Sequence, residues 1–399
     1  MTFRSVLFWV HLAAGLVCGV VIGILCLTGT ALAFEKDLIA WSERDARRVE
    51  APPRATPLAL DELADRFRQA KPGVQPSTIV VQADPHAAVA FAAGRSGTYY
   101  LNPYTGELRE PASKAMAGFM QTMLVWHRYL GFSGEQSRPR GKLVTGVANV
   151  AFLVLAVTGL YLWVPRTWSW RALRPVIWFR QNATTRARDF NWHNTIGFWS
   201  APVLIVLTLT AMPISFRWAG SFLYALTGTP LPASGPQSSG TPIPTIDVPA
   251  PAAGAQPLAL NVLLSAAREA VPGWQTITLR LAAPGAKAGP AYFTVRTRDS
   301  WPRTANTTLQ LDPFTGKTLR RDGHADLDAA RRLRGWTRYL HTGEAVGWLG
   351  QLVAGIASLG GAVLVVTGIA LSCRRFFGGG RSAETAPANA APRETANRG

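Results

Sequence analysis

The sequence predicts an α-helical membrane protein with four transmembrane helices and two α/β domains outside the membrane, built as an internal duplication. Four stretches free of Asp, Glu, Lys and Arg are long enough to cross a hydrocarbon layer of roughly 30 Å: residues 5–34, 143–165, 190–216 and 345–373. A polar segment of more than 100 residues follows the first stretch, and another follows the third. Short motifs from the first half of the chain recur in the second half.

The first apolar stretch, residues 5–34, is predicted to be a retained transmembrane helix. Ala31-Leu32-Ala33 resembles a signal-peptide cleavage site, but the apolar run is much longer than the roughly 7–15 residues of a signal core. His11, Gly15, Gly19 and Gly23 are spaced by four and share one helix face. That face offers one imidazole above a smooth groove, which suits either a flat ligand such as a porphyrin or a closely packed helix.

The polar segment that follows is predicted to form a small α/β domain. A helix begins near Asp61, which we expect to cap it, and ends near Gln69. Strands are expected at residues 78–82, 87–91, 98–101 and 107–109, with a tight turn at Asn102-Pro-Tyr-Thr-Gly106. A juxtamembrane helix over about residues 113–130 carries His127. The three cysteines all lie in or beside apolar stretches, so this domain must rely on its own core.

The charge distribution predicts the orientation in the membrane. The net charge is +18, and residues 35–141 and 216–345 hold 14 basic residues against 12 acidic and 14 against 8. The rest of the chain holds 13 against 3, and the loop 166–189 alone holds six arginines. Excess Lys and Arg in short loops marks the cytoplasmic side. We therefore expect both termini and this loop inside and the two long segments outside. The lipid bilayer is then the expected partner, and the basic charge gives no reason to expect a nucleic acid.

The remaining connections are predicted from composition. Tryptophans stand among the arginines of the loop 166–189, as in interfacial membrane segments. Residues 228–257 are rich in Pro, Gly, Ser and Ala and are expected to form an extended connector. The tail, residues 374–399, is expected to be disordered.

The second half of the chain repeats the first. His193 is followed by Gly197 as His11 is followed by Gly15, and the outer segment starts again 200 residues later. The recurring motifs are Pro57-Leu-Ala-Leu60 with Pro257-Leu-Ala-Leu260, the turn Asp312-Pro-Phe-Thr-Gly316, Arg128-Tyr-Leu with Arg338-Tyr-Leu, and Ala156-Val-Thr-Gly159 with Val365-Val-Thr-Gly368. Each half is therefore predicted to be an outward helix, an outer domain, a juxtamembrane helix and an inward helix.

Four of the six histidines sort into two pairs by depth. His11 and His193 lie near the starts of the outward helices, close to the cytoplasmic face, whereas His127 and His341 lie in the outer juxtamembrane helices. Two neutral imidazoles on opposite sides of an iron make a six-coordinate b-type haem that carries electrons. Structural histidines, or another metal such as zinc or copper, are alternatives that the spacing leaves open. Aligning the Arg-Tyr-Leu motifs displaces the two outer histidines by four residues, one helical turn.

The sequence resembles the PepSY-associated transmembrane proteins over residues 1–375. The motifs that carry the similarity are Trp192-His193-Asn194-x-x-Gly197-Phe198-Trp199, Trp126-His127-Arg128, Leu340-His341-Thr342-Gly343 and the two Pro-x-Thr-Gly turns. The resemblance implies four helices in the bacterial inner membrane, two periplasmic PepSY-like domains and two b-type haems. The sequence is similar in particular to ferric-siderophore reductases of the FoxB type. That similarity implies one-electron reduction of a ferric siderophore and release of Fe(II). The sequence does not identify the electron donor, for which a cytoplasmic reductant and a membrane quinol are the two candidates.

On this interpretation His11 and His193 hold an inner haem beside Gly15 and Gly197, and His127 and His341 hold an outer haem. Arg128 and Arg338 either pair with haem propionates or reach to the interface. The predicted segments are transmembrane helices at 5–34, 143–165, 190–216 and 345–373, periplasmic segments at 35–140 and 217–344, a cytoplasmic loop at 166–189 and a cytoplasmic tail at 374–399.

Two other functions are compatible with part of this pattern. The alternative is a non-enzymatic membrane module whose outer domains bind or regulate an envelope partner, and it needs no haem. A transporter is disfavoured, because the four apolar stretches contain no Asp, Glu, Lys or Arg for coupling.

Overall fold

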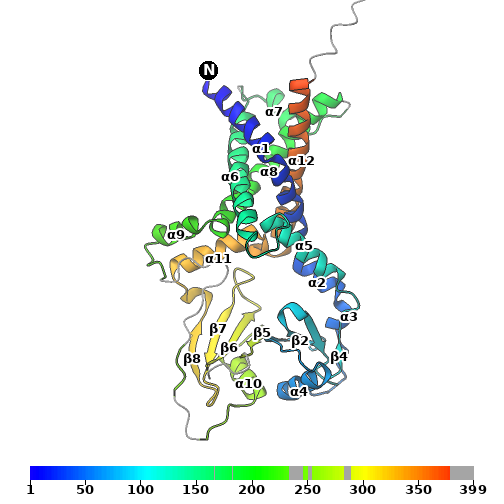
Figure 1. Ribbon diagram of the computed structural model, residues 1–399, viewed down its shortest axis with the longest axis vertical. Coiled ribbons are helices and arrows are strands. Elements are labelled where there is room, and N and C mark those ends of the chain that lie inside the picture. Colours follow the sequence, from blue (N-terminus) through cyan, green and yellow to red (C-terminus); the bar gives the residue numbers. More distant parts are fainter. Residues whose placement is uncertain (166, 182, 233–245, 250–253, 283–288, 378–399) are drawn as a thin grey trace, which may run out of the picture.

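Four long helices form a bundle at one end of the molecule, and a β-sheet lies at the other end (Figure 1). The computed structural model describes residues 1–399 except 166, 182, 233–245, 250–253, 283–288 and 378–399. Within this described part, four helices are long and apolar enough to cross a membrane: α1 (Phe3–Leu32), α6 (Arg138–Trp163), α8 (Thr185–Ser215) and α12 (Trp348–Phe377). The four predicted transmembrane helices are therefore confirmed.

The bundle is a closed ring in which α1 and α8 each pack against both α6 and α12. Four residues, one from each helix, meet at the centre of the ring. Gly361 of α12 lies against Cys26, Phe152 and Leu204, and a Cβ added at Gly361 would lie 2.7 Å from the Cys26 Sγ. We call these four residues the waist. Only glycine fits at this position unless a neighbouring side chain moves.

The sheet contains eight antiparallel strands in the order β4-β3-β2-β1-β5-β6-β7-β8. The strands are β1 (Thr78–Gln82), β2 (Val89–Ala92), β3 (Thr98–Leu101), β4 (Leu108–Arg109), β5 (Trp274–Arg280), β6 (Ala291–Thr297), β7 (Thr307–Leu311) and β8 (Thr318–Asp322). Residues 78–82 and 98–101 are strands as predicted, while β2 and β4 begin one or two residues later than expected.

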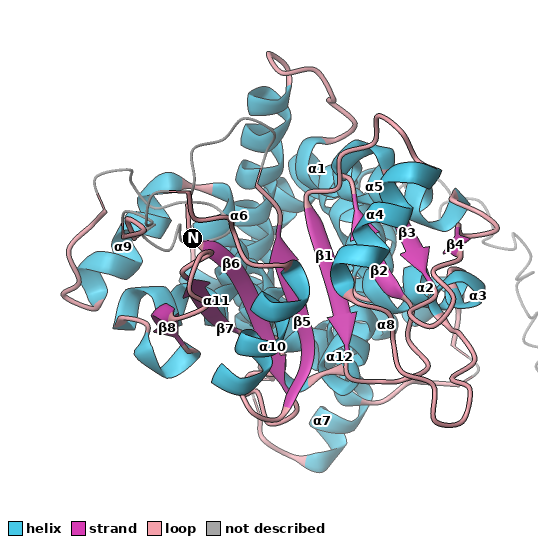
Figure 2. Cartoon of the chain, turned by 90° about the horizontal axis from the view of Figure 1, so that it is seen from below, coloured by secondary structure: helices cyan, strands magenta, loops and turns pink. Residues whose placement is uncertain are grey.

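The two outer segments share this one sheet. β1 pairs with β5 from Thr78 opposite Arg280 to Gln82 opposite Thr276, and Figure 2 shows the two strands side by side at the centre of the sheet. The two outer segments, expected from the sequence to be separate α/β domains, are therefore joined into one sheet. Helices α4 (Leu60–Ala70) and α10 (Leu260–Ala270), one from each segment, pack into the same apolar core, in which Phe67, Phe91 and Phe293 are fully buried.

The predicted helix cap at Asp61 is wrong, because its carboxylate caps the other segment's helix. Asp61 accepts hydrogen bonds from the backbone N–H groups of Leu260 (2.7 Å) and Asn261 (2.9 Å) at the start of α10. In return, the Leu60 N–H donates to the Asn261 side-chain oxygen at 3.4 Å. The β1–β5 pairing brings the two helix starts together, so unpaired N–H groups of each helix are satisfied by the other.

Shorter helices connect the bundle to the sheet. These are α2 (Glu35–Ser42), α3 (Arg44–Arg47), α5 (Ala115–Tyr129), α9 (Arg217–Leu226) and α11 (Ala329–His341), while α7 (Trp170–Ile177) lies at the opposite end of the bundle (Figure 1). Three short 3-10 segments, η1 (Gly94–Ser96), η2 (His324–Asp326) and η3 (Glu344–Val346), complete the elements described. α5 is the predicted juxtamembrane helix. Residues 233–245 and 250–253 of the predicted connector, and 378–399 of the predicted tail, lie outside the described residues.

Candidate metal centres

The four membrane-boundary histidines form two close pairs. The ring centroids of His11 (α1) and His193 (α8) are 6.4 Å apart, and those of His127 (α5) and His341 (α11) are 6.2 Å apart. An imidazole nitrogen binds a first-row metal ion at about 2 Å, and the ring centre lies about 1 Å behind that nitrogen, so one ion between two imidazoles places the ring centres roughly 6 Å apart. Both pairs therefore have a spacing that would suit two imidazole ligands of one metal ion.

The pairs lie at opposite ends of the bundle. The far-side pair, His11 and His193, lies at the end away from the sheet, near the starts of α1 and α8. The sheet-side pair, His127 and His341, lies on the connecting helices between bundle and sheet (Figure 1). The displacement of the outer histidines by one turn does not separate them, because residues four apart stay on the same helix face.

Each sheet-side ring donates a hydrogen bond to a backbone carbonyl of a long helix. The Nδ1 atom of His127 lies 3.1 Å from the Leu25 carbonyl oxygen and 3.0 Å from the Thr28 Oγ1. The Nδ1 atom of His341 lies 3.0 Å from the Leu207 carbonyl oxygen. Since a carbonyl oxygen only accepts, both Nδ1 atoms carry the proton. A neutral ring of this kind keeps the Nε2 lone pair for a metal.

The far-side rings are held by threonines of the two inward helices. The Nδ1 atom of His11 lies 2.9 Å from the Thr158 Oγ1, and that of His193 lies 2.9 Å from the Thr367 Oγ1. These threonines belong to the recurring Val-Thr-Gly motif. The sequence showed the recurrence, but only the packing of α1 on α6 and of α8 on α12 shows which histidine each threonine meets.

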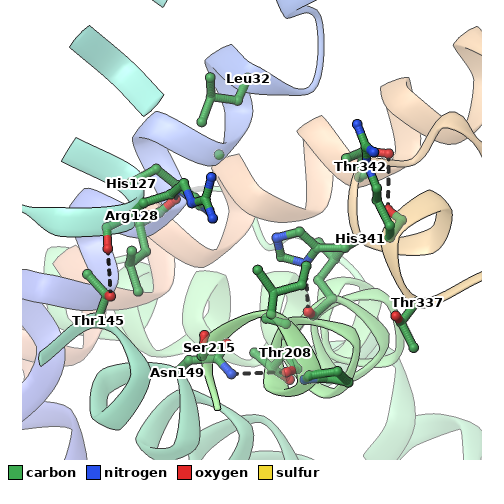
Figure 3. Close-up of a pocket in the computed structure, with 18 of the residues that line it drawn as sticks. Leu32, His127, Arg128, Thr145, Asn149, Thr208, Ser215, Thr337, His341 and Thr342 are labelled. Atoms are coloured by element: carbon green, nitrogen blue, oxygen red, sulfur yellow. Dashed lines mark hydrogen bonds between the residues drawn. The ribbon is translucent and has the colours of Figure 1, made fainter. Parts of the chain in front are cut away.

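Each pair borders a cavity large enough for a bulky ligand. The far-side cavity has a volume of about 1040 Å³, and Gly15 and Gly197 lie in its wall, as the predicted groove requires. Gly23 instead faces Val365 of α12, where an added Cβ would be 3.6 Å away, so this part of the glycine stripe packs against a helix. The sheet-side cavity has a volume of about 600 Å³. His127, Arg128 and His341 point into it (Figure 3).

Cationic side chains border both cavities. Those of the sheet-side cavity are Arg128, Lys142, Arg331, Arg334 and Arg338. Those of the far-side cavity are Arg4, Arg186, Arg374 and Arg375. Glu35 is the one carboxylate among the described residues of the sheet-side lining, and burial raises its pKa. An apolar slot with cations at its edge suits a ligand that has a flat apolar body and carboxylate groups.

Burial keeps the sheet-side imidazoles neutral. It lowers the pKa of His127 to about 4, with a smaller contribution from the charge of His341, and it lowers the pKa of His341 as well. A neutral imidazole has a nitrogen lone pair available for a metal at pH 7. No group of three or more His, Cys, Asp or Glu side chains lies together in the described part of the chain. A closed zinc site of four protein ligands is therefore not formed by these residues.

The waist separates the two cavities. Phe152 and Leu204 line both of them, Cys26 lines the sheet-side cavity, and Gly361 lines the far-side cavity. The partition is thus one layer of side chains, with no acidic or basic group in it. Two ligands bound in the cavities would be separated by this layer only.

The residues fit two molecules of haem b. The histidine spacing suits an iron with two imidazole ligands, and among the described residues no hydrogen bond engages the Nε2 atoms of the sheet-side pair. The cavities have apolar walls, and the bordering arginines suit the propionates. Arg128 and Arg338, which the sequence suggested as partners of the propionates, both border the sheet-side cavity.

Comparison with known proteins agrees with the membrane architecture. The family model described as PepSY-associated TM region matches residues 8–375. No curated protein matches the chain.

Proposed function

Because the chain belongs to the PepSY-associated transmembrane family, we propose that it is a dihaem b-type reductase of the bacterial inner membrane. In this proposal it passes electrons across the membrane to a ferric siderophore in the periplasm and releases Fe(II). One observation carries the proposal: two histidine pairs with ring centroids 6.4 and 6.2 Å apart lie at opposite ends of one helix bundle. Such an arrangement suits electron transfer along the bundle rather than chemistry at one end.

The orientation follows from the positive-inside rule. The arginine-rich loop 166–189 and both termini lie in the cytoplasm, and the sheet lies in the periplasm. The far-side pair then holds the inner haem and the sheet-side pair holds the outer haem. A reporter fused after Arg180 is expected to be cytoplasmic, and one inserted near Ser238, outside the described residues, is expected to be periplasmic. Exchanged reporter signals would reverse the assignment of the two haems and contradict the proposal.

The residues of the chain would bind the two haems, orient them and keep them apart. Haem b, when bound, supplies the one-electron chemistry, while the protein sets its position and electrostatics. His11 and His193 would hold one iron, His127 and His341 would hold the other, and the bordering arginines would pair with the propionates. The waist excludes water between the sites. The Fe(III) of the substrate gains one electron, which a cytoplasmic reductant or a membrane quinol supplies, and Fe(II) is held less tightly by hard oxygen ligands.

Measuring the haem content of the purified protein tests the proposal. Protein purified from haem-replete cells is expected to contain about two haems b per chain in a pyridine haemochrome assay, with low-spin spectra, because each iron has two imidazole ligands. The alternative, a haem-free module that regulates an envelope partner, predicts a colourless protein. Folded, colourless protein would therefore contradict the reductase and favour the alternative.

A further inference from the structure

Thr158 and Thr367 each contact a histidine of a neighbouring helix. We infer that these two threonines are positioning residues that fix the tautomer of His11 and His193 and so set the reduction potential of the inner haem. The part of the inference that concerns the potential rests on the proposed function. The part that concerns the tautomer rests on hydrogen bonds within the chain alone.

The hydroxyl protons of both threonines are already engaged. The Thr158 Oγ1 donates to the Val154 carbonyl oxygen at 2.6 Å, one helical turn earlier in α6. The Thr367 Oγ1 donates to the Val363 carbonyl oxygen at 2.8 Å in α12. A hydroxyl has one proton, so towards the histidine each oxygen can only accept. The Nδ1 atoms of His11 and His193 must therefore donate, and their Nε2 atoms keep the lone pair.

The residue after each threonine makes room for the ring. A Cβ added at Gly159 would lie 3.1 Å from the His11 Cε1, and one added at Gly368 would lie 3.3 Å from the His193 Cε1. Both distances are shorter than ordinary van der Waals contact. The Thr-Gly pair thus holds the imidazole by its Nδ1 edge and lets it lie close to the helix backbone. This explains why the two residues recur together in the two inward helices.

The far-side pair differs from the sheet-side pair in what holds it. The sheet-side rings donate to the backbone carbonyls of Leu25 and Leu207, which no side-chain substitution removes. Of the far-side rings, His11 depends on the Thr158 hydroxyl, whereas His193 has the Leu364 backbone carbonyl beside the Thr367 hydroxyl. A hydrogen bond from Nδ1–H makes the imidazole a more basic ligand, and more basic ligands favour the ferric state. Removing the hydroxyl is therefore expected to raise the reduction potential of the inner haem and leave that of the outer haem unchanged.

Thr158→Val tests this effect, because valine keeps the branched shape and lacks the hydroxyl. Loss of such a partner typically weakens metal affinity by about ten- to a hundredfold, so we expect haem affinity at the inner site to fall by that factor and its potential to rise. Thr158→Ser keeps a hydroxyl and is expected to leave both unchanged. Thr210→Val is the matched control: its buried hydroxyl donates to the Val206 carbonyl at 2.7 Å, it lines neither cavity and, among the described residues, it bonds to no histidine. An unchanged inner potential in Thr158→Val would overturn the inference.

A second measurement does not need haem. In full-length protein produced without haem and labelled with ¹⁵N-histidine, NMR is expected to show His11 protonated at Nδ1, with its signal assigned by its loss in His11→Ala. Thr158→Val is expected to weaken this preference, and Thr210→Val is expected to keep it. A wild-type chain that binds no haem would contradict the proposed function, and the protonated nitrogen of His11 would still test the inference about the tautomer. A His11 ring protonated at Nε2 in the wild type would overturn that inference.

Discussion

His193→Ala is expected to remove the inner haem and leave the outer haem in place. His193 and His11 are the two imidazoles of the far-side pair, with ring centroids 6.4 Å apart, and a haem at this site would lose one of the two side chains that hold its iron. The haemochrome assay should then give about one haem per chain in place of about two. The remaining haem should accept electrons from reductants added on the periplasmic side and none from the cytoplasmic side.

His341→Ala is expected to have the complementary effect. The outer haem should be lost, and the inner haem should still be reduced from the cytoplasmic side. Both variants should lose ferric-siderophore reduction, because a hydrocarbon core of roughly 30 Å lies between donor and acceptor. The double variant should contain almost no haem.

His86→Ala is the matched control for these variants. His86 lies in the sheet domain, where its Nδ1 is 3.3 Å from the Val49 carbonyl oxygen, and it lines neither cavity. This variant should keep both haems and full activity. If His11→Ala and His193→Ala removed different haems, the pairing by membrane side would be wrong, and the proposed route of the electrons would fail with it.

Local sequence patterns were sufficient for the membrane helices and for the sorting of the histidines. Absence of charge over a membrane-spanning length is a property of a short stretch, and the arginines of the loop 166–189 predict an orientation without reference to packing. Once the helices are placed, His11 and His193 must lie at one end of the bundle. The strands at 78–82 and 98–101 were likewise predicted from their own residues and turns.

Features that depend on contacts between distant segments were not predictable in the same way. The pairing of β1 with β5 joins residues about 200 positions apart, and no single-strand pattern selects that partner. Asp61 looked like a cap for its own helix because a cap is usually local, whereas its carboxylate reaches the start of α10. The role of Thr158 and Thr367 likewise became visible only when each was placed beside a histidine of another helix.

A substitution at the waist is expected to lower both the stability of the protein and its haem content. Gly361→Ala introduces a Cβ that would lie 2.7 Å from the Cys26 Sγ and 3.2 Å from the Phe152 ring. Overpacking a close-packed core costs about 1–3 kcal/mol, and here the strain falls on all four helices. We expect a lower thermal unfolding midpoint in detergent and loss of haem from both sites, because Phe152 and Leu204 border both cavities.

Two variants separate this strain from the general effect of replacing a helical glycine. Gly118→Ala in α5 is the control, since an added Cβ there meets nothing within 4 Å, and its midpoint should stay the same or rise slightly. Cys26→Ala removes the sulfur that the new Cβ would meet. The double variant Cys26→Ala/Gly361→Ala should therefore be more stable than the sum of the two single effects predicts, since the two side chains are in contact. Strictly additive effects would show that Cys26 and Gly361 are not in contact in the folded protein.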